Sequence, residues 1–423
     1  MPDATPRPRV VIIGGGFGGL KAAKALRKAP VDVLLIDRRN HHVFQPLLYQ
    51  VATAALSPGD IAAPIRWILR HQENTQVWLG EVTSIDPHAK RLTLADGATV
   101  DFDCLIVSAG ATHAYFGHDE WQRWAPGLKT LEDALDIRRR VLLAFELAER
   151  ATDPAEQRRL LTFVVVGGGP TGVELAGALA EISRHTLAND FREIDPETAR
   201  VILIEGGPTI LGTYPEELST FARRKLERLG VNVWTNSVVT GISDGKVHLR
   251  GETIEAGTIL WAAGVSASPL GRSLGVPLDR AGRVLVNDDL SVPGHPEIFV
   301  IGDLAALKGP DGKWLPGVAQ VAIQQARHAA DNLLRRMRGE PTRPFVYRDL
   351  GNLATIGRNS AIADLRGWES KGFFAWLVWL FVHVMNLVGF RNRLSVLVQW
   401  AFSYLTYQRS VRLITYDDDR ELS

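Results

Sequence analysis

The feature that most constrains this chain is a duplicated segment in which an apolar strand runs into a glycine-rich turn and then a helix. The first copy reads VVIIGGGFGGL from Val10 to Leu20, and the second reads FVVVGGGPTGVEL from Phe163 to Leu175. In each copy a further apolar strand follows and ends at an acid, Asp37 in the first and Glu205 in the second. Strand, glycine turn, helix and strand make a βαβ unit. The sequence therefore predicts an α/β protein with two Rossmann-like domains.

Each glycine turn has the spacing that lets the main chain approach a pyrophosphate. The first glycine makes a tight turn, the second admits the ligand, and the third lets the helix pack closely on the strand. The helix N-terminus then presents free N–H groups to the phosphates. These positions are Gly14, Gly16 and Gly19 in the first copy, and Gly167, Gly169 and Gly172 in the second. One such motif is weak evidence, but two copies with downstream acids predict two dinucleotide sites.

The second site is expected to bind NADH. Glu205 lies 38 residues after Gly167, a longer spacing than the usual one of about 20, because a polar insertion, SRHTLANDFREIDPETAR, precedes its strand. A carboxylate at that strand end accepts from the ribose 2′-OH and repels a 2′-phosphate. Gly206 and Gly207 follow it, with no arginine adjacent. The site should therefore prefer NADH to NADPH.

The first site is expected to bind FAD. Asp37 lies 23 residues after Gly14, close to the usual spacing for a ribose contact. Arg38 and Arg39 follow it and would by themselves suit a 2′-phosphate. Asp303, which comes directly after the apolar strand of IFVIGDLA, offers a second contact suited to the ribityl–phosphate linker of a flavin. A solvated or capping role is the alternative for Asp303.

Charge and cysteine content exclude several classes of protein. Lys plus Arg number 48 against 47 for Asp plus Glu, so no basic footprint for nucleic acid is expected. The single cysteine, Cys104, cannot form an intramolecular disulfide or a CxxC redox pair, and its apolar surroundings predict a buried thiol. His41 and His42 lack further ligands at metal spacing, so no metal site is predicted.

The C-terminal region differs in composition from the rest. Residues 373–390 form an apolar run broken only by His383 and Asn386, and a second apolar, aromatic helix is expected over 394–407. No acidic residue occurs from Lys371 to Tyr416, whereas Lys371, Arg391, Arg393, Arg409 and Arg412 supply positive charge. Three interpretations remain open: an amphipathic anchor lying in one leaflet, a spanning helix, and a buried core or dimer interface. We expect contact with membrane lipid through residues 368–412.

The chain resembles the two-dinucleotide flavoprotein reductases, and specifically the type II NADH:quinone dehydrogenases. The resemblance covers nearly the whole chain and rests on VVIIGGGFGGL, FQPLLYQVA, VVVGGGPTGVELAGAL, ILWAAGV, IFVIGDLA, AQVAIQQA and WLVWLFVHVMNLVGFRNR. It implies a glutathione-reductase-like architecture with C-terminal amphipathic membrane-anchoring helices. Disulfide reductases and sulfide:quinone reductases use cysteine pairs, which this chain lacks.

The resemblance implies a set of site residues and a reaction. FAD would contact Gly14, Gly15, Gly16, Phe17, Gly18, Gly19, Asp37, Arg38, Arg39, Val82, Gly110, Asp303, Ala319, Gln320 and Lys371, of which Val82 is matched through GEVTSID and Lys371 through KGFFAW. Gln320 and Gln324 are four residues apart on one helix face and would contact the quinone. Glu174, placed by the sequence in the first turn of the second glycine-loop helix, is expected either to assist proton movement to the quinone or to interact with the helix dipole.

These expectations combine into one leading function and two alternatives. The predicted ranges are 1–115 and 266–340 for an FAD-binding domain, 116–265 for an NADH-binding domain and 341–423 for the anchoring region. The leading function is non-proton-pumping transfer of electrons from NADH through FAD to a membrane quinone at the cytoplasmic face of the cell membrane, since no secretory signal is recognised. A homodimer is compatible with it. The alternatives are a soluble NADH-dependent flavin reductase or oxidase, and a non-enzymatic nucleotide-binding flavoprotein.

Overall fold

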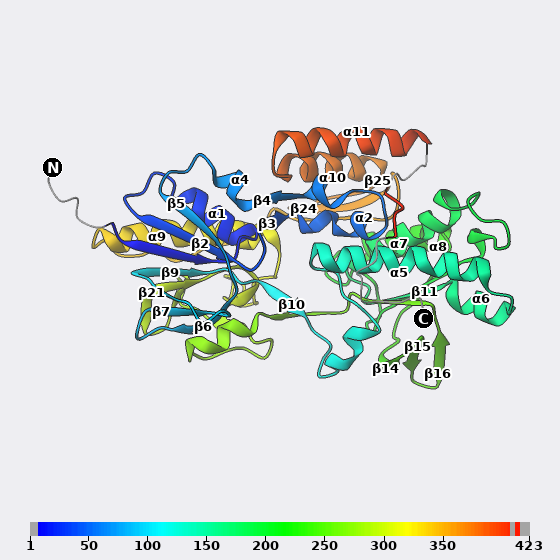
Figure 1. The fold of residues 1–423 in the computed structure, drawn as a ribbon, viewed down its shortest axis with the longest axis horizontal. Helices are drawn as coiled ribbons and strands as arrows, with labels where there is room; N and C mark the ends of the chain where they lie inside the picture. Colours follow the sequence, from blue (N-terminus) through cyan, green and yellow to red (C-terminus); the bar gives the residue numbers. More distant parts are fainter. Residues whose placement is uncertain (1–6, 407–410, 415–423) are drawn as a thin grey trace. The chain divides into compact units, whose positions relative to one another are not determined.

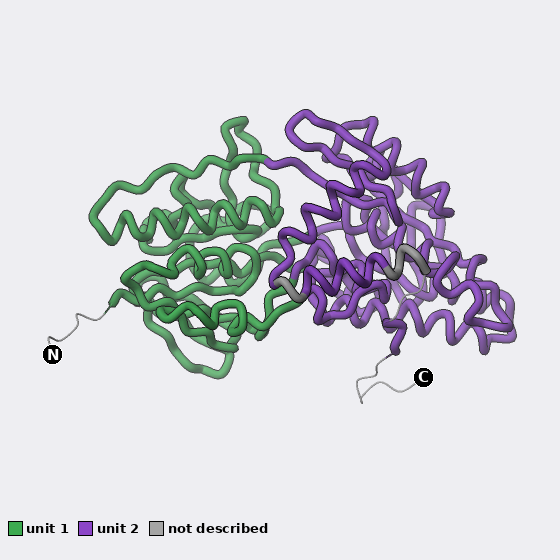
Figure 2. Tube along the Cα trace, turned by 90° about the horizontal axis from the view of Figure 1, so that it is seen from above, with its two compact units in different colours: residues 1–43, 62–112, 265–349 green, residues 44–61, 113–264, 350–423 purple. Residues whose placement is uncertain are grey.

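The chain folds into two compact units, each assembled from separated stretches of sequence (Figure 2). The computed structural model describes residues 7–406 and 411–414, and the side chains of residues 390, 391 and 402–406 lie outside that description. Within the described residues, unit 1 comprises 7–43, 62–112 and 265–349, and unit 2 comprises 44–61, 113–264, 350–406 and 411–414.

The centre of unit 1 is a six-stranded sheet in the order β20-β21-β9-β1-β2-β5. Figure 1 labels four of its strands, β2, β5, β9 and β21. Its strands are β1 (Arg9–Ile13), β2 (Asp32–Asp37), β5 (Thr75–Leu79), β9 (Cys104–Val107), β20 (Ser291–Val292) and β21 (His295–Val300). Every neighbouring pair is parallel except β20 with β21. The chain builds the sheet from β1 outward to β5 and then from β9 outward to β21. The strand order therefore reverses beside the turn after β1, which is where doubly wound sheets bind ligands.

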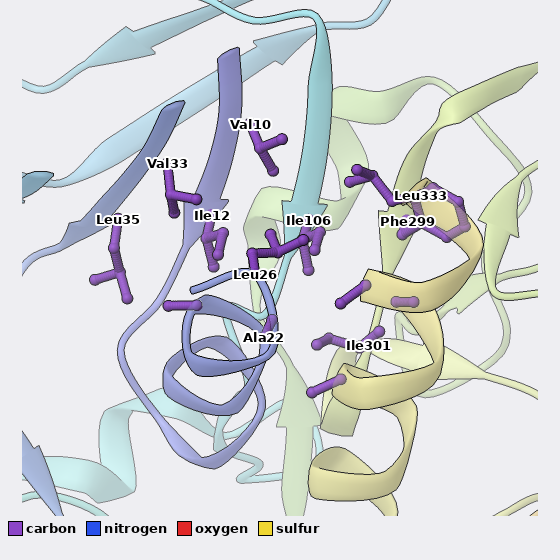
Figure 3. Packing of buried hydrophobic residues seen from close by; sticks show 14 of the residues in the cluster. Val10, Ile12, Ala22, Leu26, Val33, Leu35, Ile106, Phe299, Ile301 and Leu333 are labelled. Carbon is purple, nitrogen blue, oxygen red and sulfur yellow. The ribbon is translucent and has the colours of Figure 1, made fainter. Parts of the chain in front are cut away.

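Both faces of this sheet are buried, because successive strand residues point to opposite sides. Val10 and Ile12 of β1 face the helices α1 (Phe17–Ala25) and α9 (Ala319–Met337), which cover one side of the sheet together (Figure 3). Val11 and Ile13 face the other side, where they join residues of the antiparallel meander that follows β5. Cys104 on β9 is buried, as predicted.

Smaller elements complete unit 1. An antiparallel meander consists of β6 (Val82–Asp86), β7 (Arg91–Leu94) and β8 (Thr99–Asp101). The remaining elements are β3 (His41–Val43), β4 (Ala62–Pro64), α4 (Ile65–Leu69), β10 (Ala111–His113), β18 (Val265–Ala267), η5 (Pro269–Leu274), β19 (Val284–Leu285), η6 (Gly302–Leu304) and β22 (Ala305–Ala306).

Unit 2 repeats the same topology on a smaller sheet. Its four parallel strands are β11 (Thr162–Val166), β12 (Arg200–Ile204), β13 (Val231–Trp234) and β17 (Thr258–Trp261), in the order β13-β12-β11-β17. The second meander consists of β14 (Val239–Ser243), β15 (Lys246–Leu249) and β16 (Glu252–Glu255). In both units the chain passes from the glycine turn through a helix, two further parallel strands and a three-stranded meander to the strand on the other side of the first one. The repeat therefore extends beyond the glycine motifs.

The helices of unit 2 surround this sheet. They are η1 (Gln45–Leu47), α2 (Leu48–Ala52), α3 (Pro58–Ile61), η2 (Asp119–Arg123), α5 (Leu131–Arg150), α6 (Pro154–Leu160), α7 (Pro170–Glu181), η3 (Ile182–Thr186), η4 (Pro196–Thr198) and α8 (Glu216–Arg228). Helix α7 begins at Pro170, earlier than the predicted place of Glu174 in its first turn implied, because Gly169 caps it and the fixed backbone of proline suits the first helical position. Glu174 therefore lies beyond the first turn, and the helix-dipole interpretation was wrong.

The C-terminal part of unit 2 contains a sheet that the sequence did not predict. β23 (Asn352–Thr355), β24 (Ala361–Leu365) and β25 (Trp368–Gly372) form an antiparallel three-stranded sheet. Two helices follow, α10 (Phe373–Asn386) and α11 (Phe390–Thr406), and they lie against each other (Figure 1).

The expected 18-residue helix over 373–390 was wrong in length. Helix α10 ends at Asn386 because Leu387 has an extended backbone and Gly389 turns the chain at a φ of 88°. Among the described residues, none of the helices is long and apolar enough to cross a membrane. Tyr407 and Arg409, which the sequence placed in this region, lie outside the described residues.

The two units do not follow the predicted domain ranges residue for residue. Residues 44–61 group with unit 2, and residues 341–349 group with unit 1. The predicted ranges concern ligand binding, whereas the units reflect compactness. The division of the chain into FAD-binding, NADH-binding and anchoring ranges stays a prediction.

Candidate functional site

The first glycine turn is held in a shape that side chains would prevent. Gly14 has a φ of 95°, and a Cβ there would lie 2.3 Å from the carbonyl oxygen of Ser108. A Cβ on Gly19 would lie 1.7 Å from the carbonyl oxygen of Gly14, so the helix can pack this closely on the turn only without a side chain. Gly14 N–H also donates to the carbonyl of Ile36 at 2.8 Å, which fixes the turn against β2.

Asp37 braces this turn from the end of β2. Its Oδ2 accepts a hydrogen bond from Gly15 N–H at 2.5 Å, and its Oδ1 accepts one from Arg39 N–H at 2.7 Å. A carboxylate oxygen can accept more than one hydrogen bond, so both remain able to accept from a ligand hydroxyl. The acid predicted to bind ribose therefore also orders the loop around the phosphate position.

The second glycine turn has the same construction. Gly167 has a φ of 111°, and a Cβ on Gly172 would lie 1.8 Å from the carbonyl oxygen of Gly167. Glu205 Oε2 accepts from Gly168 N–H at 2.7 Å, and its Oε1 accepts from Gly207 N–H at 2.6 Å. The longer spacing to Glu205 has no effect on this geometry, because the extra residues lie between α7 and β12.

The middle glycine of each turn faces open space. A Cβ built on Gly16 or on Gly169 meets no atom within 4 Å, although both residues have ordinary negative φ angles. Both also cap the N-terminus of a helix, α1 or α7, where main-chain N–H groups lack intrahelical partners. Space and donors coincide at these two positions, so the residues present fit the pyrophosphate of a dinucleotide.

A histidine supports the first turn. His42 Nδ1 donates to the carbonyl of Gly15 at 3.0 Å, and its ring packs edge-on against Phe17 with centroids 5.2 Å apart. Burial lowers the pKa of His42, and the hydrogen bond to Gly15 raises it in part, so the net shift favours the neutral ring. Its role as a loop support was missed from the sequence, where the residue was considered only as a metal ligand.

The start of α9 places the predicted glutamines in different roles. Gln325, which the sequence analysis passed over, is buried and its Oε1 accepts from Gly302 N–H at 2.7 Å, next to Asp303. Gln324 binds the main chain of Arg348 through both ends of its amide, at 2.9 and 3.0 Å. Ala319 and Gln320 lie in the first turn of α9, and Gly110 has a φ of 68° with open space where a Cβ would lie. The contacts of these residues with FAD or quinone stay predictions.

Three other predicted FAD residues have protein partners. Arg38 forms an ion pair with Glu81 at 3.6 Å, and both side chains are more than half exposed. Val82 begins β6 and pairs with Leu94. Lys371 lies on β25 in unit 2, where its ammonium group contacts the Glu217 carboxylate. A role for Lys371 in binding FAD would require it to exchange that partner, and it stays a prediction.

Glu174 lies in a protein environment that favours its neutral form. The residue keeps some exposure, but protein atoms enclose its carboxyl, and this burial raises its pKa to about 8. Thr355 on β23 lowers the pKa in part, since its main-chain N–H and its hydroxyl lie 3.4 and 3.5 Å from Glu174 Oε1. A carboxyl that holds its proton near neutral pH can donate it. No pattern in the sequence pointed to Thr355, because its strand was not predicted.

Comparisons with known proteins agree with this geometry. Residues 8–330 match the family model "Pyridine nucleotide-disulphide oxidoreductase", and residues 350–408 match "NDH2 C-terminal domain". Type II NADH:quinone oxidoreductases NdhA and Ndh of Mycobacterium tuberculosis are 49% and 47% identical, over 97% and 98% of this chain and 90% and 92% of theirs. The chain belongs to the type II NADH:quinone oxidoreductases.

Solved structures share the fold. NDH2 from Plasmodium falciparum, solved with NADH, has a TM-score of 0.87 at 23% identity and covers 97% of this chain and 100% of its own. The sulfide:quinone oxidoreductase of Aquifex aeolicus has a TM-score of 0.73 at 20% identity, over 91% and 92% of the two chains. As a type II NADH:quinone oxidoreductase, the chain is an FAD-dependent enzyme that oxidises NADH, and its single cysteine separates it from relatives that use a redox disulfide.

Proposed function

We propose that this enzyme binds FAD at the glycine turn of unit 1 and NADH at that of unit 2, and that a quinone accepts the electrons from a membrane. The observation that supports this most directly is the pair of open positions at Gly16 and Gly169, each at a helix N-terminus and each beside a braced acid. A bound flavin supplies the chemistry of hydride acceptance and electron release. The residues of the chain bind, orient and supply a proton.

The glycine turns would orient the two cofactors. Asp37 and Asp303 in unit 1 suit the ribose and the ribityl–phosphate linker of FAD. Glu205 in unit 2 would accept from the ribose 2′-OH of NADH and would repel the 2′-phosphate of NADPH. Glu205 is already fixed by two main-chain N–H groups, so this selectivity needs no rearrangement of the loop.

Glu174 would supply a proton during quinone reduction. Reduction of a quinone to a quinol takes up two protons, and a carboxyl with a pKa of about 8 is mostly protonated at neutral pH. We expect Glu174→Gln to slow quinone reduction about 100-fold, the scale of general acid catalysis, and to leave reduction of the flavin by NADH nearly unchanged. An unchanged rate of quinone reduction would exclude this role.

The C-terminal helices would attach the enzyme to the membrane surface. Phe374, Leu377, Phe381 and Met385 lie on one face of α10 and are 41–64% exposed. Leu394, Leu397 and Val398 on α11 are 39–60% exposed. Lys371 and Arg412 pair with Glu217 and Asp190, so these two cations are occupied by protein carboxylates. The proposal therefore rests on the apolar side chains of α10 and α11. We propose the cytoplasmic face of the membrane as the location, because NADH is supplied there.

Two experiments test these assignments. Anaerobic addition of NADH to the purified enzyme should bleach the flavin absorbance, and subsequent addition of a quinone should restore it. Vesicle flotation should show that Phe374→Ser/Phe381→Ser binds lipid about tenfold less tightly, since each ring removes apolar area from water. The matched control is Leu79→Ser/Val346→Ser, which changes residues 64% and 68% exposed in unit 1. Equal flotation of the two variants would contradict the attachment through α10.

A further inference from the structure

A chain of hydrogen bonds inside unit 2 joins Glu174 to the C-terminal helix α11. Thr355 Oγ1 lies 3.5 Å from Glu174 Oε1 and 3.1 Å from the hydroxyl of Tyr49 on α2. Gln50 Nε2 donates to the Tyr49 hydroxyl at 2.9 Å, and Trp400 Nε1 on α11 donates to Gln50 Oε1 at 2.7 Å. The four partner side chains are all at least 91% buried.

The direction of donation is fixed from the far end of this chain. The indole N–H of Trp400 can only donate, so the Gln50 carbonyl oxygen faces it and the Gln50 amide nitrogen faces Tyr49. The Tyr49 hydroxyl receives that bond and can donate its own proton to Thr355. The Thr355 hydroxyl can then donate to Glu174. Every bond in the chain thus presents a donor toward the carboxyl, and aligned bonds of this kind strengthen one another.

The hydrogen-bond chain cannot conduct protons from solvent to Glu174. Its outer members are an amide and an indole, whose N–H groups do not exchange protons in the pH range of the enzyme. A relay could extend only over the two hydroxyl groups. An aligned and closed set of donors has a different effect, since it stabilises the carboxylate that remains after Glu174 gives up its proton.

We propose that Thr355 and Tyr49 are positioning residues that prepare Glu174 to release its proton, and that Trp400 orders them from α11 through Gln50. The inference rests on the proton-donating role of Glu174 proposed above. The two contacts of Thr355 with the Glu174 carboxyl are long, at 3.4 and 3.5 Å. On ionisation they become charge-assisted hydrogen bonds, which are shorter and stronger. The helix that carries part of the membrane-facing surface is thereby connected to the proton donor.

The other ionisable groups around Glu174 do not account for the effect assigned to the hydrogen-bond chain. Tyr214, which precedes α8, interacts with both Glu174 and Asp364, and burial raises the pKa of Tyr214, so it stays protonated. Of the elements that pack against α7, β11, β13 and β23 carry no ionisable side chain, and α2 carries Tyr49 of the hydrogen-bond chain. The remaining neighbours, β12, η3 and α8, carry Arg200, Arg184, His185, Glu216, Glu217, Arg223, Arg224, Lys225, Glu227 and Arg228. Burial raises the pKa of Glu174, and Thr355 lowers it in part. No charged side chain of the described elements that pack against α7 contributes to the shift.

The test is a direct titration of Glu174 in the FAD-bound enzyme. The infrared carbonyl band of its protonated carboxyl is identified by its loss in Glu174→Gln and is followed as the pH rises. Thr355→Val keeps the shape and the main-chain N–H but removes the hydroxyl, and it should raise the pKa by about one unit, the scale of one hydrogen bond to a charged group. Thr355→Ser should restore the original value. Tyr49→Phe should shift the pKa in the same direction by a smaller amount.

A matched pair of tryptophans tests the connection to α11. Trp400→Phe removes the indole N–H that binds Gln50 and should raise the pKa of Glu174. Trp379→Phe on α10 is the control, because Trp379 is buried, packs on Trp400 with centroids 5.4 Å apart, and its Nε1 has no hydrogen-bond partner among the described residues. Trp379→Phe should leave the pKa of Glu174 unchanged.

The outcomes separate this inference from the proposed function. An unmoved pKa in Thr355→Val, or equal shifts in the two tryptophan variants, would overturn the inference even if Glu174→Gln abolishes quinone reduction. Normal quinone reduction by Glu174→Gln would overturn the proton-donating role, whatever the titrations show.

Discussion

At the scale of single residues, the glycines of the two turns separate into those that the fold needs and those that a ligand would need. Gly19 and Gly172 sit against a carbonyl oxygen, at 1.7 and 1.8 Å from an added Cβ. Gly16 and Gly169 have open space and ordinary backbone angles, so alanine there costs the protein itself little. Substitution of the first kind of glycine should therefore lower stability, and substitution of the second kind should weaken ligand binding.

Gly16→Ala should reduce FAD content, and Gly169→Ala should weaken NADH binding about tenfold while FAD is retained, because a methyl group would occupy the phosphate position. Thermal unfolding of the apoprotein should be unchanged in both. Gly19→Ala and Gly172→Ala should instead lower stability by about 3 kcal/mol, since backbone must shift. Gly59→Ala, where the space is also open, is the control for both measurements. Loss of stability in Gly16→Ala would contradict the distinction.

Glu174 also predicts how stability depends on pH. Its pKa is raised to about 8 in the folded enzyme by burial, whereas the unfolded chain has an ordinary value near 4.5. Between these values the folded state binds more protons, so the stability contributed by this group is complete below the lower pKa and is lost as the pH rises through the upper one. Glu174→Gln carries no such loss. As the pH rises from 5 to 9, the unfolding free energy of the variant should therefore increase relative to that of the wild type by roughly 3–5 kcal/mol.

Denaturant titrations of the two proteins across that range measure this difference. A constant offset at all pH values would show that the Glu174 carboxyl ionises as freely in the folded enzyme as in the unfolded chain.

The sequence predicted the geometry of residues that obey a spacing rule and missed roles that depend on burial. The glycine turns, Asp37 and Glu205 have the expected arrangement because a strand end and a helix start fix their positions, and their contacts with ligands stay predictions. The contact of Gln325 with Gly302 was missed because helical periodicity places residues on faces but does not say which face is buried. Thr355 and His42 were missed for the same reason, since their roles follow from what packs against them.

At the scale of elements, α7 approaches the C-terminal sheet of unit 2 through a pair of glycines. A Cβ on Gly177 would lie 2.9 Å from the main-chain nitrogen of Gly357, which follows β23 and has a φ of 63°. The same helix carries Glu174, and the same strand carries Thr355. The close approach therefore sets the distance between Glu174, the proposed proton donor, and Thr355.

Gly177→Val should disturb this contact from the helix side. We expect a loss of about 1–3 kcal/mol in stability from overpacking and slower quinone reduction, with FAD content and flavin reduction by NADH preserved. Urea unfolding and the two half-reactions, measured separately, check these effects. Equal slowing of both half-reactions would mean that the helix moves as a whole and that the nucleotide turn is disturbed too.

The C-terminal sheet escaped prediction for a physical reason. Its strands have four or five residues and are joined by short turns at Asn359 and Arg366, both of which have positive φ angles. Such short strands leave no periodic pattern long enough to recognise. The apolar run after it was visible from composition, but its division into α10 and α11 depends on one backbone position, Gly389.

At the scale of the whole molecule, the two-domain α/β architecture followed from the sequence because the duplicated unit determines so much of it. A glycine turn at the end of a buried strand requires a parallel neighbour, a crossover helix and a second strand, and both units show this order. Membrane attachment depends instead on which apolar side chains remain exposed after folding. These side chains could be identified only from the structure.

Membrane attachment predicts a difference between quinones that only the complete enzyme can show. A long-tailed quinone stays in the lipid, so its reduction requires the enzyme to be on the vesicle surface, whereas a water-soluble analogue reaches the enzyme from solution. Phe374→Ser/Phe381→Ser should lower the rate with the long-tailed quinone about tenfold at limiting lipid, in proportion to the lost affinity. Its rate with the soluble analogue should match that of Leu79→Ser/Val346→Ser. A parallel fall with both quinones would mean that these phenylalanines form part of the quinone site itself, because loss of binding to lipid cannot slow a reaction that occurs in solution.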